Sequence, residues 1–373
     1  MLLQAAVLGA VLLAMVWLVA NVQSNLERQN INSGFGFLSE RAGFGINQTL
    51  IDYTEDSSFG RVLTVGLLNT LLVSVLGVFF ATVLGFSLGV ARLSSNWLIN
   101  KIAMVYVEIF RNVPLLLQIM FWYFGVLRSL PTPRQAASFG DAIFLSNRGI
   151  VVPAIEAGGG AGWYAAALAI GLVAFIWLRR RARLALADGT MMPVWRPLLM
   201  VTVASFGFAA LLAGVPFSLD MPALKGFNFR GGITVIPEFV ALLLALSLYT
   251  AAFIAEIVRA GIQSVSKGQR EAAAALGLPD KTALSLVVIP QALRVIIPPL
   301  TSQYLNLTKN SSLAVAIAYP DIVSVFAGTT LTEVGQAVEI IFITMMIYLR
   351  LSLLTSDAMN RYNARIALVG QDA

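Results

Sequence analysis

The sequence contains no cysteine and no histidine, and only 12% of its 373 residues are charged. The two missing residue types exclude disulfides, thiol nucleophiles, imidazole general bases, and zinc or haem sites built on those side chains. The shortage of charge excludes a water-soluble globule, because an ordinary soluble chain has about 25% charged residues. With 58% hydrophobic residues and a mean hydropathy of +0.81, most of the chain is expected to face lipid or other buried helices.

Long apolar runs predict an all-α membrane protein with about eight spanning helices, because about 20 apolar residues cross a bilayer. The predicted spans are residues 2–20, 62–90, 102–127, 161–178, 197–215, 236–258, 295–318 and 335–355. The first lacks the basic segment that opens a signal peptide, so we expect a retained anchor. The span at 161–178 is expected to end at Arg179. Neither 21–61 nor 128–160 is predicted to form a folded domain.

The basic residues indicate which ends of the spans are cytoplasmic. With a cytoplasmic amino terminus, the inside segments carry fifteen Lys and Arg residues and the outside segments carry eight. The opposite orientation would invert this ratio. We therefore expect both termini inside. The arginine run at 179–183 is mainly a topology signal, with lipid headgroup contact as a by-product, and the formal charge of +6 does not indicate a nucleic-acid partner.

The segment 268–290 has a sequence pattern that predicts a specific local structure. An alanine run after Glu271 favours a helix, Gly277 suits the left-handed residue that follows a helix, and Pro279 prevents the helix from continuing. The pattern predicts a short helix, a sharp turn and a second helix on the inside face. Such a pair can dock in a groove on a cytoplasmic partner, or it can be a connector that has no partner.

This segment resembles the EAA loop of permease subunits of ATP-driven bacterial importers. The family pattern is E-A-A, three residues, G, nine residues, I, one residue, L, P; here Val287 and Ile289 replace the Ile and the Leu, and every spacing is kept. Three more segments, 110–118, 249–259 and 309–313, are similar to the polar amino acid permeases. The residues 34–38 and the long insert before residue 236 are similar to the larger subunit of the general L-amino acid importers.

The resemblance implies a five-helix type I importer core made of the spans at 62–90, 102–127, 236–258, 295–318 and 335–355, with three extra spans. It also implies five segments: 1–61, 62–130, an insertion at 131–235 with a transmembrane hairpin, 236–356, and a tail at 357–373. The residues expected to couple to the ATPase are Gly268, Glu271, Ala272, Ala273, Gly277 and Pro290.

The implied partners are a cytoplasmic ATPase dimer that binds ATP and Mg, a periplasmic solute-binding protein, a second related permease subunit and an amino acid substrate, in a bacterial inner membrane. The chain has no G-x-x-x-x-G-K-[ST] phosphate-binding loop, so no cofactor is expected on it and the ATPase must be a separate subunit. The predicted function is therefore a transporter subunit and not an enzyme.

Polar residues inside the predicted spans are candidates for the substrate path, because charge at bilayer depth is costly unless it is paired or faces protein or water. Glu108 and Arg111 can pair at i, i+3 or can meet substrate, and Pro114 is expected to kink the helix beside them. Glu256 and Arg259 repeat that spacing. The remaining candidates are Asn112, Gln118, Tyr249, Lys309, Asn310 and Ser311.

Lys309 is the most informative charge, because it is expected near the middle of the span at 295–318. Its ammonium can meet the carboxylate of an amino acid, or it can pair with a structural carboxylate or carbonyl. Glu339 is expected at the outer interface without a role. Gly85 and Gly89 are spaced for a close helix contact.

Two other functions compete with an ATP-driven importer. A secondary transporter driven by an ion gradient would explain intramembrane charge, but it has no need for a docking pair at 268–290 and is typically built of two comparable halves. An intramembrane enzyme is disfavoured, because the sequence has no histidine, no cysteine and no acid pair placed beside a nucleophile.

Overall fold

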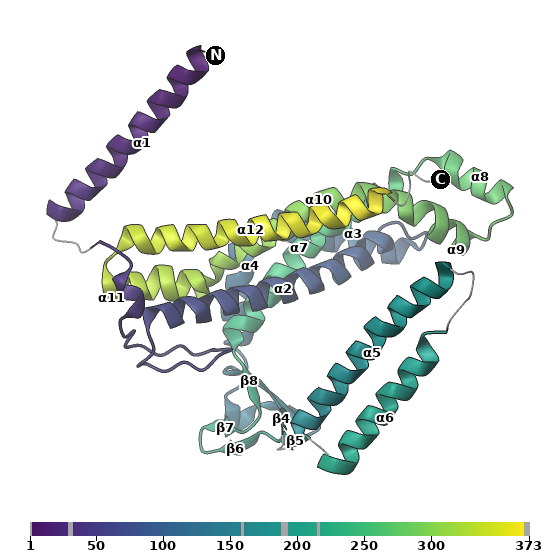
Figure 1. The fold of residues 1–373 in the computed structure, drawn as a ribbon, viewed down its shortest axis with the longest axis horizontal. Helices are drawn as coiled ribbons and strands as arrows, with labels where there is room; N and C mark the ends of the chain where they lie inside the picture. Colours follow the sequence, from purple (N-terminus) through teal and green to yellow (C-terminus); the bar gives the residue numbers. More distant parts are fainter. Residues whose placement is uncertain (1, 29–32, 158–159, 188–192, 215–216, 369–373) are drawn as a thin grey trace. The chain divides into compact units, whose positions relative to one another are not determined.

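The computed structural model describes residues 2–28, 33–157, 160–187, 193–214 and 217–368 (Figure 1). The chain divides into two compact units. One contains Met1–Arg128 and Pro237–Ala373, and the other contains Ser129–Ile236.

The first unit is helical. α2 packs along α7, and α7 also contacts α3, α4 and α10. The unit consists of α1 (Leu2–Arg28), η1 (Gly36–Ser39), α2 (Phe59–Ala91), α3 (Trp97–Asn112), α4 (Leu115–Met120), η2 (Phe121–Leu127), α7 (Pro237–Gln263), α8 (Lys267–Ala275), α9 (Asp280–Ala283), η4 (Leu284–Val288), α10 (Ile289–Asn310), η5 (Ser311–Ile317), η6 (Val323–Thr330), α11 (Leu331–Val334) and α12 (Ala337–Leu368).

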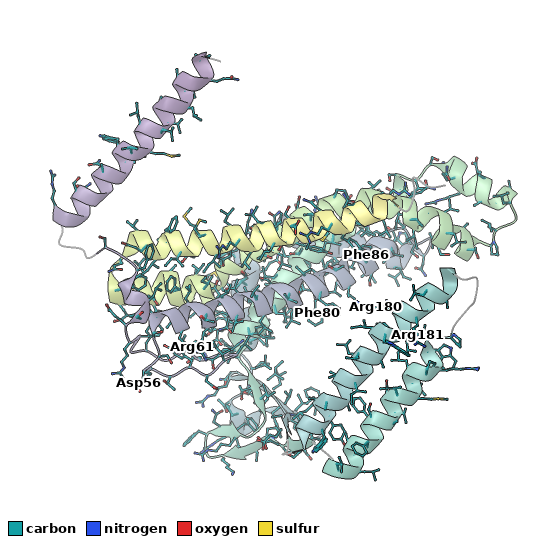
Figure 2. The ribbon with its side chains drawn as sticks, viewed as in Figure 1. Asp56, Arg61, Phe80, Phe86, Arg180 and Arg181 are labelled. Atoms are coloured by element: carbon teal, nitrogen blue, oxygen red, sulfur yellow. The ribbon has the colours of Figure 1, made fainter. Side chains whose placement is uncertain are left out.

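Among the described residues, six helices are long and apolar enough to cross a membrane, or seven if α3 with the α4–η2 segment counts as one broken span. α1 contributes a shorter apolar stretch, Ala6–Leu18. Exposed aromatic side chains such as Phe80 on α2 fit helices that face lipid (Figure 2). The all-α membrane architecture is confirmed, while the count of eight spans stays a prediction.

Two predicted spans are organised differently from the expectation. The stretch 102–127 is interrupted at Val113 and Pro114, and its two parts meet at 105°. The kink predicted at Pro114 is thus a break, which a single proline in a continuous helix does not produce. The span predicted at 295–318 begins earlier, because the apolar helix runs over Leu284–Ile317.

Glycines set the distance between α2 and α7. A Cβ atom on Gly85 would lie 2.5 Å from Cβ of Ile254, and one on Gly89 would lie 2.7 Å from Cβ of Val258. Real Cβ atoms do not approach so closely, so the two backbones touch only because these positions lack side chains. The close helix contact predicted for Gly85 and Gly89 is confirmed.

Residues 33–58 cover the end of this unit where α2 and α12 begin. Phe37 and Phe59 are buried there with Phe326 and Ile340. The N–H of Gly34 donates to Oε1 of Glu339 at 2.7 Å, so Glu339 anchors this segment although no role was expected for it. Burial, together with the nearby Glu55 carboxylate, raises the pKa of Tyr53, whose hydroxyl donates to the Phe44 carbonyl at 2.6 Å.

The second unit is a helical hairpin, α5 (Ala161–Ala187) and α6 (Trp195–Ala213), with short strands at one end. One antiparallel sheet has the order β1-β2-β3-β8, and the pairs β4–β5 and β6–β7 stand apart. β4 and β5 flank the start of α5 and the end of α6. The strands are β1 (Ala137–Phe139), β2 (Ile143–Ser146), β3 (Gly149–Val152), β4 (Ala154–Ala157), β5 (Phe217–Asp220), β6 (Ala223–Lys225), β7 (Asn228–Arg230) and β8 (Ile233–Val235); a short helix, η3 (Pro133–Gln135), precedes them.

Strands β1 to β4 were not anticipated within 128–160, which was not predicted to form a folded domain. Strands of three or four residues are too short to give a detectable alternation, and β3 pairs with β8, more than 80 residues later. The apolar span predicted at 161–178 lies within a longer helix. α5 continues to Ala187, with the Arg179 guanidinium 4.7 Å from the centroid of the Phe175 ring and that of Arg181 4.4 Å from the centroid of the Trp177 ring. Arginine is a good helix former, so a basic run does not end a helix.

Substitution by alanine is expected to have opposite effects at two helical glycines, one at the contact between α2 and α7 and one in open space. Gly85→Ala forces a methyl group against Ile254 and is expected to lower stability by about 1 to 3 kcal/mol, the usual range for overpacking. Gly207→Ala in α6 meets open space and is expected to raise stability slightly, because alanine favours a helix. Thermal unfolding of both variants in detergent measures the difference. Equal melting temperatures would show that α2 can move away from α7 without cost.

Candidate functional site

The segment 268–290 forms two helices joined by a tight turn. α8 ends at Ala275, and Gly277 follows in the left-handed conformation at a φ of 72°. The Gly277 N–H donates to the Ala274 carbonyl at 2.9 Å, and the Leu278 N–H donates to the Ala273 carbonyl at 3.1 Å, which satisfies carbonyls at the helix end. The predicted helix, turn and second helix are confirmed.

α8 presents one face to solvent. Gly268, Glu271 and Ala272 are exposed, whereas Ala273 is 3% exposed and faces inward. The side-chain amide of Gln291 donates to Oε1 of Gln269 at 3.0 Å, so α8 is tied to α10. Pro290 is exposed in the first turn of α10. The expected coupling residues thus lie on α8, in the turn after it and at the start of α10, and Glu271 is exposed to a partner.

A cavity of about 880 Å³ lies between this pair and the adjoining ends of α2, α3 and α7. Its lining is mainly apolar, with Val90, Leu278 and Val288 among the contributors and Arg270 at one side. The cavity leaves space around the helical pair, so α8 and α9 are not packed tightly on every side against the spans.

Glu256 lies beside this region and is held by two arginines. It forms ion pairs with Arg259, at i, i+3 on α7, and with Arg92, which directly follows α2. The Glu256–Arg259 pair predicted from the sequence is confirmed, and Arg92 is an additional partner. Because both oxygens of Glu256 are engaged, it fits a structural clamp between α2 and α7 better than a contact for substrate.

Glu108 and Arg111 do not form the predicted ion pair in the described structure. The Arg111 guanidinium lies 5.3 Å from the centroid of the Phe253 ring. Glu108 instead accepts from Asn112, whose side-chain amide also donates to the Glu108 carbonyl at 2.8 Å. The two charges lie on α3 three residues apart, but the aromatic ring of α7 attracts the guanidinium.

Gln118 holds the break between α3 and α4. Its amide nitrogen donates to the carbonyls of Phe110 and Val113, at 3.0 and 2.9 Å, and the residue is 5% exposed. These carbonyls lack helical partners, because Pro114 has no N–H and the helix stops. Both hydrogen bonds that the Gln118 side-chain amide can donate are thus made to backbone carbonyls at the break. This favours a structural role over contact with substrate.

Lys309 stands at the end of α10, where the helix tightens into η5, rather than in the middle of a continuous helix. It is exposed and forms no ion pair with any carboxylate of the described residues. It lines a cavity of about 440 Å³ together with Ser312, Val323, Thr344, Met345 and Tyr348. A cation and three hydroxyl-bearing side chains thus converge on one space.

The other candidates lie around this region with different roles. Asn310 is half-buried, and Ser311 is fully buried with its hydroxyl donating to the Thr308 carbonyl at 2.8 Å. Tyr249 packs on Phe253 with ring centroids 4.9 Å apart. Ser311 and Tyr249 are thus engaged within the fold.

A second break, at residues 318–321 between η5 and η6, lies at the end of the span predicted at 295–318, and its contacts with α2 were not anticipated from the sequence. Asn69 of α2 donates to the Pro320 carbonyl at 2.9 Å, and the hydroxyl of Thr70 accepts the Ile322 N–H at 3.1 Å. Asp321 is fully buried in this break. The tripeptide Tyr319-Pro320-Asp321 was the available signal, because a proline followed by a charge interrupts an apolar run.

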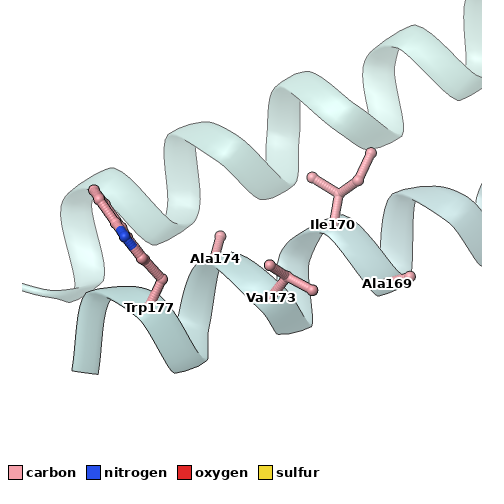
Figure 3. Close-up of a pocket in the computed structure, with 5 residues that line it drawn as sticks. All are labelled: Ala169, Ile170, Val173, Ala174 and Trp177. Atoms are coloured by element: carbon pink, nitrogen blue, oxygen red, sulfur yellow. The ribbon is translucent and has the colours of Figure 1, made fainter. Parts of the chain in front are cut away.

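An apolar hollow lies on α5. It measures about 440 Å³ and is lined by Ala169, Ile170, Val173, Ala174 and Trp177 (Figure 3). The lining offers no charged group and no hydroxyl, so it suits a lipid chain and not a polar solute.

Comparison with known proteins identifies the family. The model for "Binding-protein-dependent transport system inner membrane component" matches residues 77–366. The chain is 55% identical over 354 residues to the "Putative amino-acid ABC transporter permease protein YhdX" of Escherichia coli (strain K12). The aligned region covers 95% of this chain and 90% of that protein.

It is also 51% identical to the "General L-amino acid transport system permease protein AapQ" of Rhizobium johnstonii, over 96% of this chain and 90% of that protein. The chain is 46% identical to the "Glutamate/glutamine/aspartate/asparagine transport system permease protein BztB" of Rhodobacter capsulatus, over 98% of this chain and 93% of that protein. The chain therefore belongs to the family of inner-membrane components of binding-protein-dependent transport systems.

Proposed function

We propose that the chain is one of two different permease subunits of an ATP-driven importer for polar or general L-amino acids. Its family gives the general arrangement: an integral inner-membrane subunit that is not an enzyme, with an ATPase and a solute-binding protein as separate partners. An ion-gradient-driven transporter has no support from the relatives. The names of three relatives support amino acids as the substrate class.

The exposed face of α8 is the observation that supports coupling of this chain to the ATPase through α8. Glu271 and Ala272 project from a short helix that is tied to α10 by Gln269 and Gln291. When an ATPase dimer closes, a helix docked in it moves with it, and α10 joins that helix to the membrane interior. ATP hydrolysis on the partner thereby reorients the spans between inward and outward openings.

Glu271→Lys is expected to abolish uptake while the protein remains in the membrane. The side chain is exposed, so folding does not depend on it, whereas charge reversal at a docking surface can cost several kcal/mol. The measurement is the amount of ATPase that copurifies with the tagged chain from cells expressing the complete transporter.

Glu333→Lys, an equally exposed charge reversal on α11, is the matched control and should keep the wild-type amount of ATPase. Unchanged association and uptake in Glu271→Lys would make 268–290 a connector without a partner.

The cavity that contains Lys309 is the best candidate for the substrate path. The ammonium has no carboxylate partner in the described chain, and the hydroxyls of Ser312 and Thr344, which donate to the carbonyls of Lys309 and Ile340, still have lone pairs that can accept. A free amino acid supplies the missing carboxylate. The bonding of Glu256 and Gln118 argues against both as substrate contacts, while Glu108 and Arg111 remain secondary candidates.

Lys309→Met keeps most of the side-chain length and removes the charge. If the ammonium meets the substrate carboxylate, uptake should fall about ten- to a hundredfold, because a charge-assisted hydrogen bond contributes about 1.5 to 3 kcal/mol. Assembly and ATP hydrolysis in detergent should persist. Loss of assembly would instead assign Lys309 to a structural pair across a subunit interface, and normal uptake would reject any role for its charge.

We further propose that the second permease subunit is a related but different chain. The α5–α6 hairpin and its strands add a complete unit to the five-helix core, so an identical partner is not needed to supply it. Purification through a tag on this chain, followed by identification of the copurified proteins, should yield a second permease in equal amount. An active complex that contains two copies of this chain and no other permease would contradict this.

The proposed orientation places both termini in the cytoplasm. Lys267 and Arg270 lie on α8, and Arg92 and Arg259 lie at the adjoining ends of α2 and α7. These basic residues gather at the end of the helical unit that carries the docking pair, which fits the cytoplasmic excess of Lys and Arg.

A further inference from the structure

The carboxylate of Asp321 has no cationic partner among the described residues. Asp321 is 0% exposed and lies in the short connection between two apolar helical segments, η5 and η6. None of the ion pairs in the described structure includes it. A buried carboxylate without a cation is costly and calls for a compensating group.

Part of the compensation is structural. Oδ1 of Asp321 accepts the backbone N–H of Ser324 at 2.8 Å, which caps the first turn of the helix that contains η6. An aspartate and an asparagine cap helices about equally well. The cap therefore explains an oxygen at this position and does not explain a charge.

The second oxygen lies beside a residue that lines the Lys309 cavity. Oδ2 lies 3.5 Å from the hydroxyl of Tyr348, and Tyr348 itself lines that cavity. At 3.5 Å this is a weak hydrogen bond, which a stronger donor can replace. Asp321 is thus one side chain away from the space that Lys309 faces.

The position of Asp321 is fixed from two sides. Asn69 and Thr70 bind the backbone at Pro320 and Ile322, and the Cβ that Gly66 lacks would lie 2.9 Å from the Ile322 Cα. Tyr348 follows Ala337 by eleven residues, about 17 Å along α12 at 1.5 Å per residue, which is about half of a 30 Å hydrocarbon core. A carboxylate held rigidly at that depth is placed to meet a charge that enters the membrane.

We propose that Asp321 is the counter-charge for the α-ammonium group of the transported amino acid. The substrate lies in the cavity with its carboxylate on Lys309, and its ammonium displaces the Tyr348 hydroxyl from Oδ2 of Asp321. The site recognises the two charges common to all α-amino acids and leaves the side chain of the substrate to the rest of the cavity. This inference rests on the proposed function of the Lys309 cavity.

The test uses Asp321→Asn, which keeps the helix cap and removes the charge. The assembled transporter is reconstituted in liposomes with its solute-binding protein and is supplied with each of a panel of labelled L-amino acids. We expect uptake to fall at least tenfold, with wild-type assembly, melting temperature and basal ATP hydrolysis. Asp357→Asn, which removes the carboxylate of an exposed pair with Arg361, is the control and should transport normally.

Two further measurements separate the explanations. Equilibrium binding of the labelled amino acid to the purified complex, without the solute-binding protein, should weaken in Asp321→Asn and in Lys309→Met alike. Asp321→Ala should also lose the cap and melt at a lower temperature than Asp321→Asn.

Normal uptake in Asp321→Asn with lost uptake in Lys309→Met would overturn the role of Asp321 and leave the proposed substrate path intact. Failure of Asp321→Asn to assemble, or a loss of stability equal to that of Asp321→Ala, would assign the charge to folding and also overturn the inference. Normal uptake in both variants would reject the cavity itself.

Discussion

Backbone hydrogen bonding in a medium without water is the constraint on which this structure depends. Two of the apolar segments are interrupted inside the helical unit, and each interruption leaves carbonyls or N–H groups that lipid cannot satisfy. At the break beside Pro114 the amide of Gln118 serves two carbonyls. At the break beside Pro320 the side chains of Asn69 and Thr70 serve a carbonyl and an N–H. The polar residues inside the unit are therefore of two kinds, those consumed by the breaks and those that remain available.

The candidate residues for the substrate path divide in the same way, into those already bonded within the fold and those still available. Gln118 and Ser311 are engaged with backbone carbonyls, and Glu256 is engaged with two arginines. In the described part of the chain, Lys309 and Asp321 have no ion-pair partner, and Asp321 has a weak hydrogen bond to Tyr348, which lines the same cavity as Lys309. Intramembrane charge that the fold does not use for itself is where substrate recognition is expected.

The sequence predicted the features that depend on neighbours along the chain. The helix, turn and helix at 268–290 follow from the alanine run, Gly277 and Pro279, and the Glu256–Arg259 pair follows from i, i+3 spacing. Features made by distant residues were missed for a physical reason. Arg92 reaches Glu256 across 164 positions, and β3 finds β8 after more than 80 residues, so neither leaves a local pattern. The Glu108–Arg111 prediction failed because Phe253, on another helix, offered the guanidinium an aromatic face.

α10 connects the segment 268–290 to the Lys309 cavity. The helix begins at Ile289, beside the hydrogen bond between Gln269 and Gln291, and it ends one residue after Lys309. Its 22 residues correspond to about 33 Å at 1.5 Å per residue, so one helix reaches from the docking pair to the interior. At the far end, the break at 318–321 separates α10 and η5 from η6, which Asn69 and Thr70 hold to α2. A displacement of α8 that α10 transmits would reach Lys309, whereas Asp321 lies at the far side of the break, in the segment that is held to α2. If Lys309 and Asp321 bind the two ends of a zwitterion as proposed, such a displacement changes the distance between the two charges, and the affinity of the site then depends on the state of the docking pair.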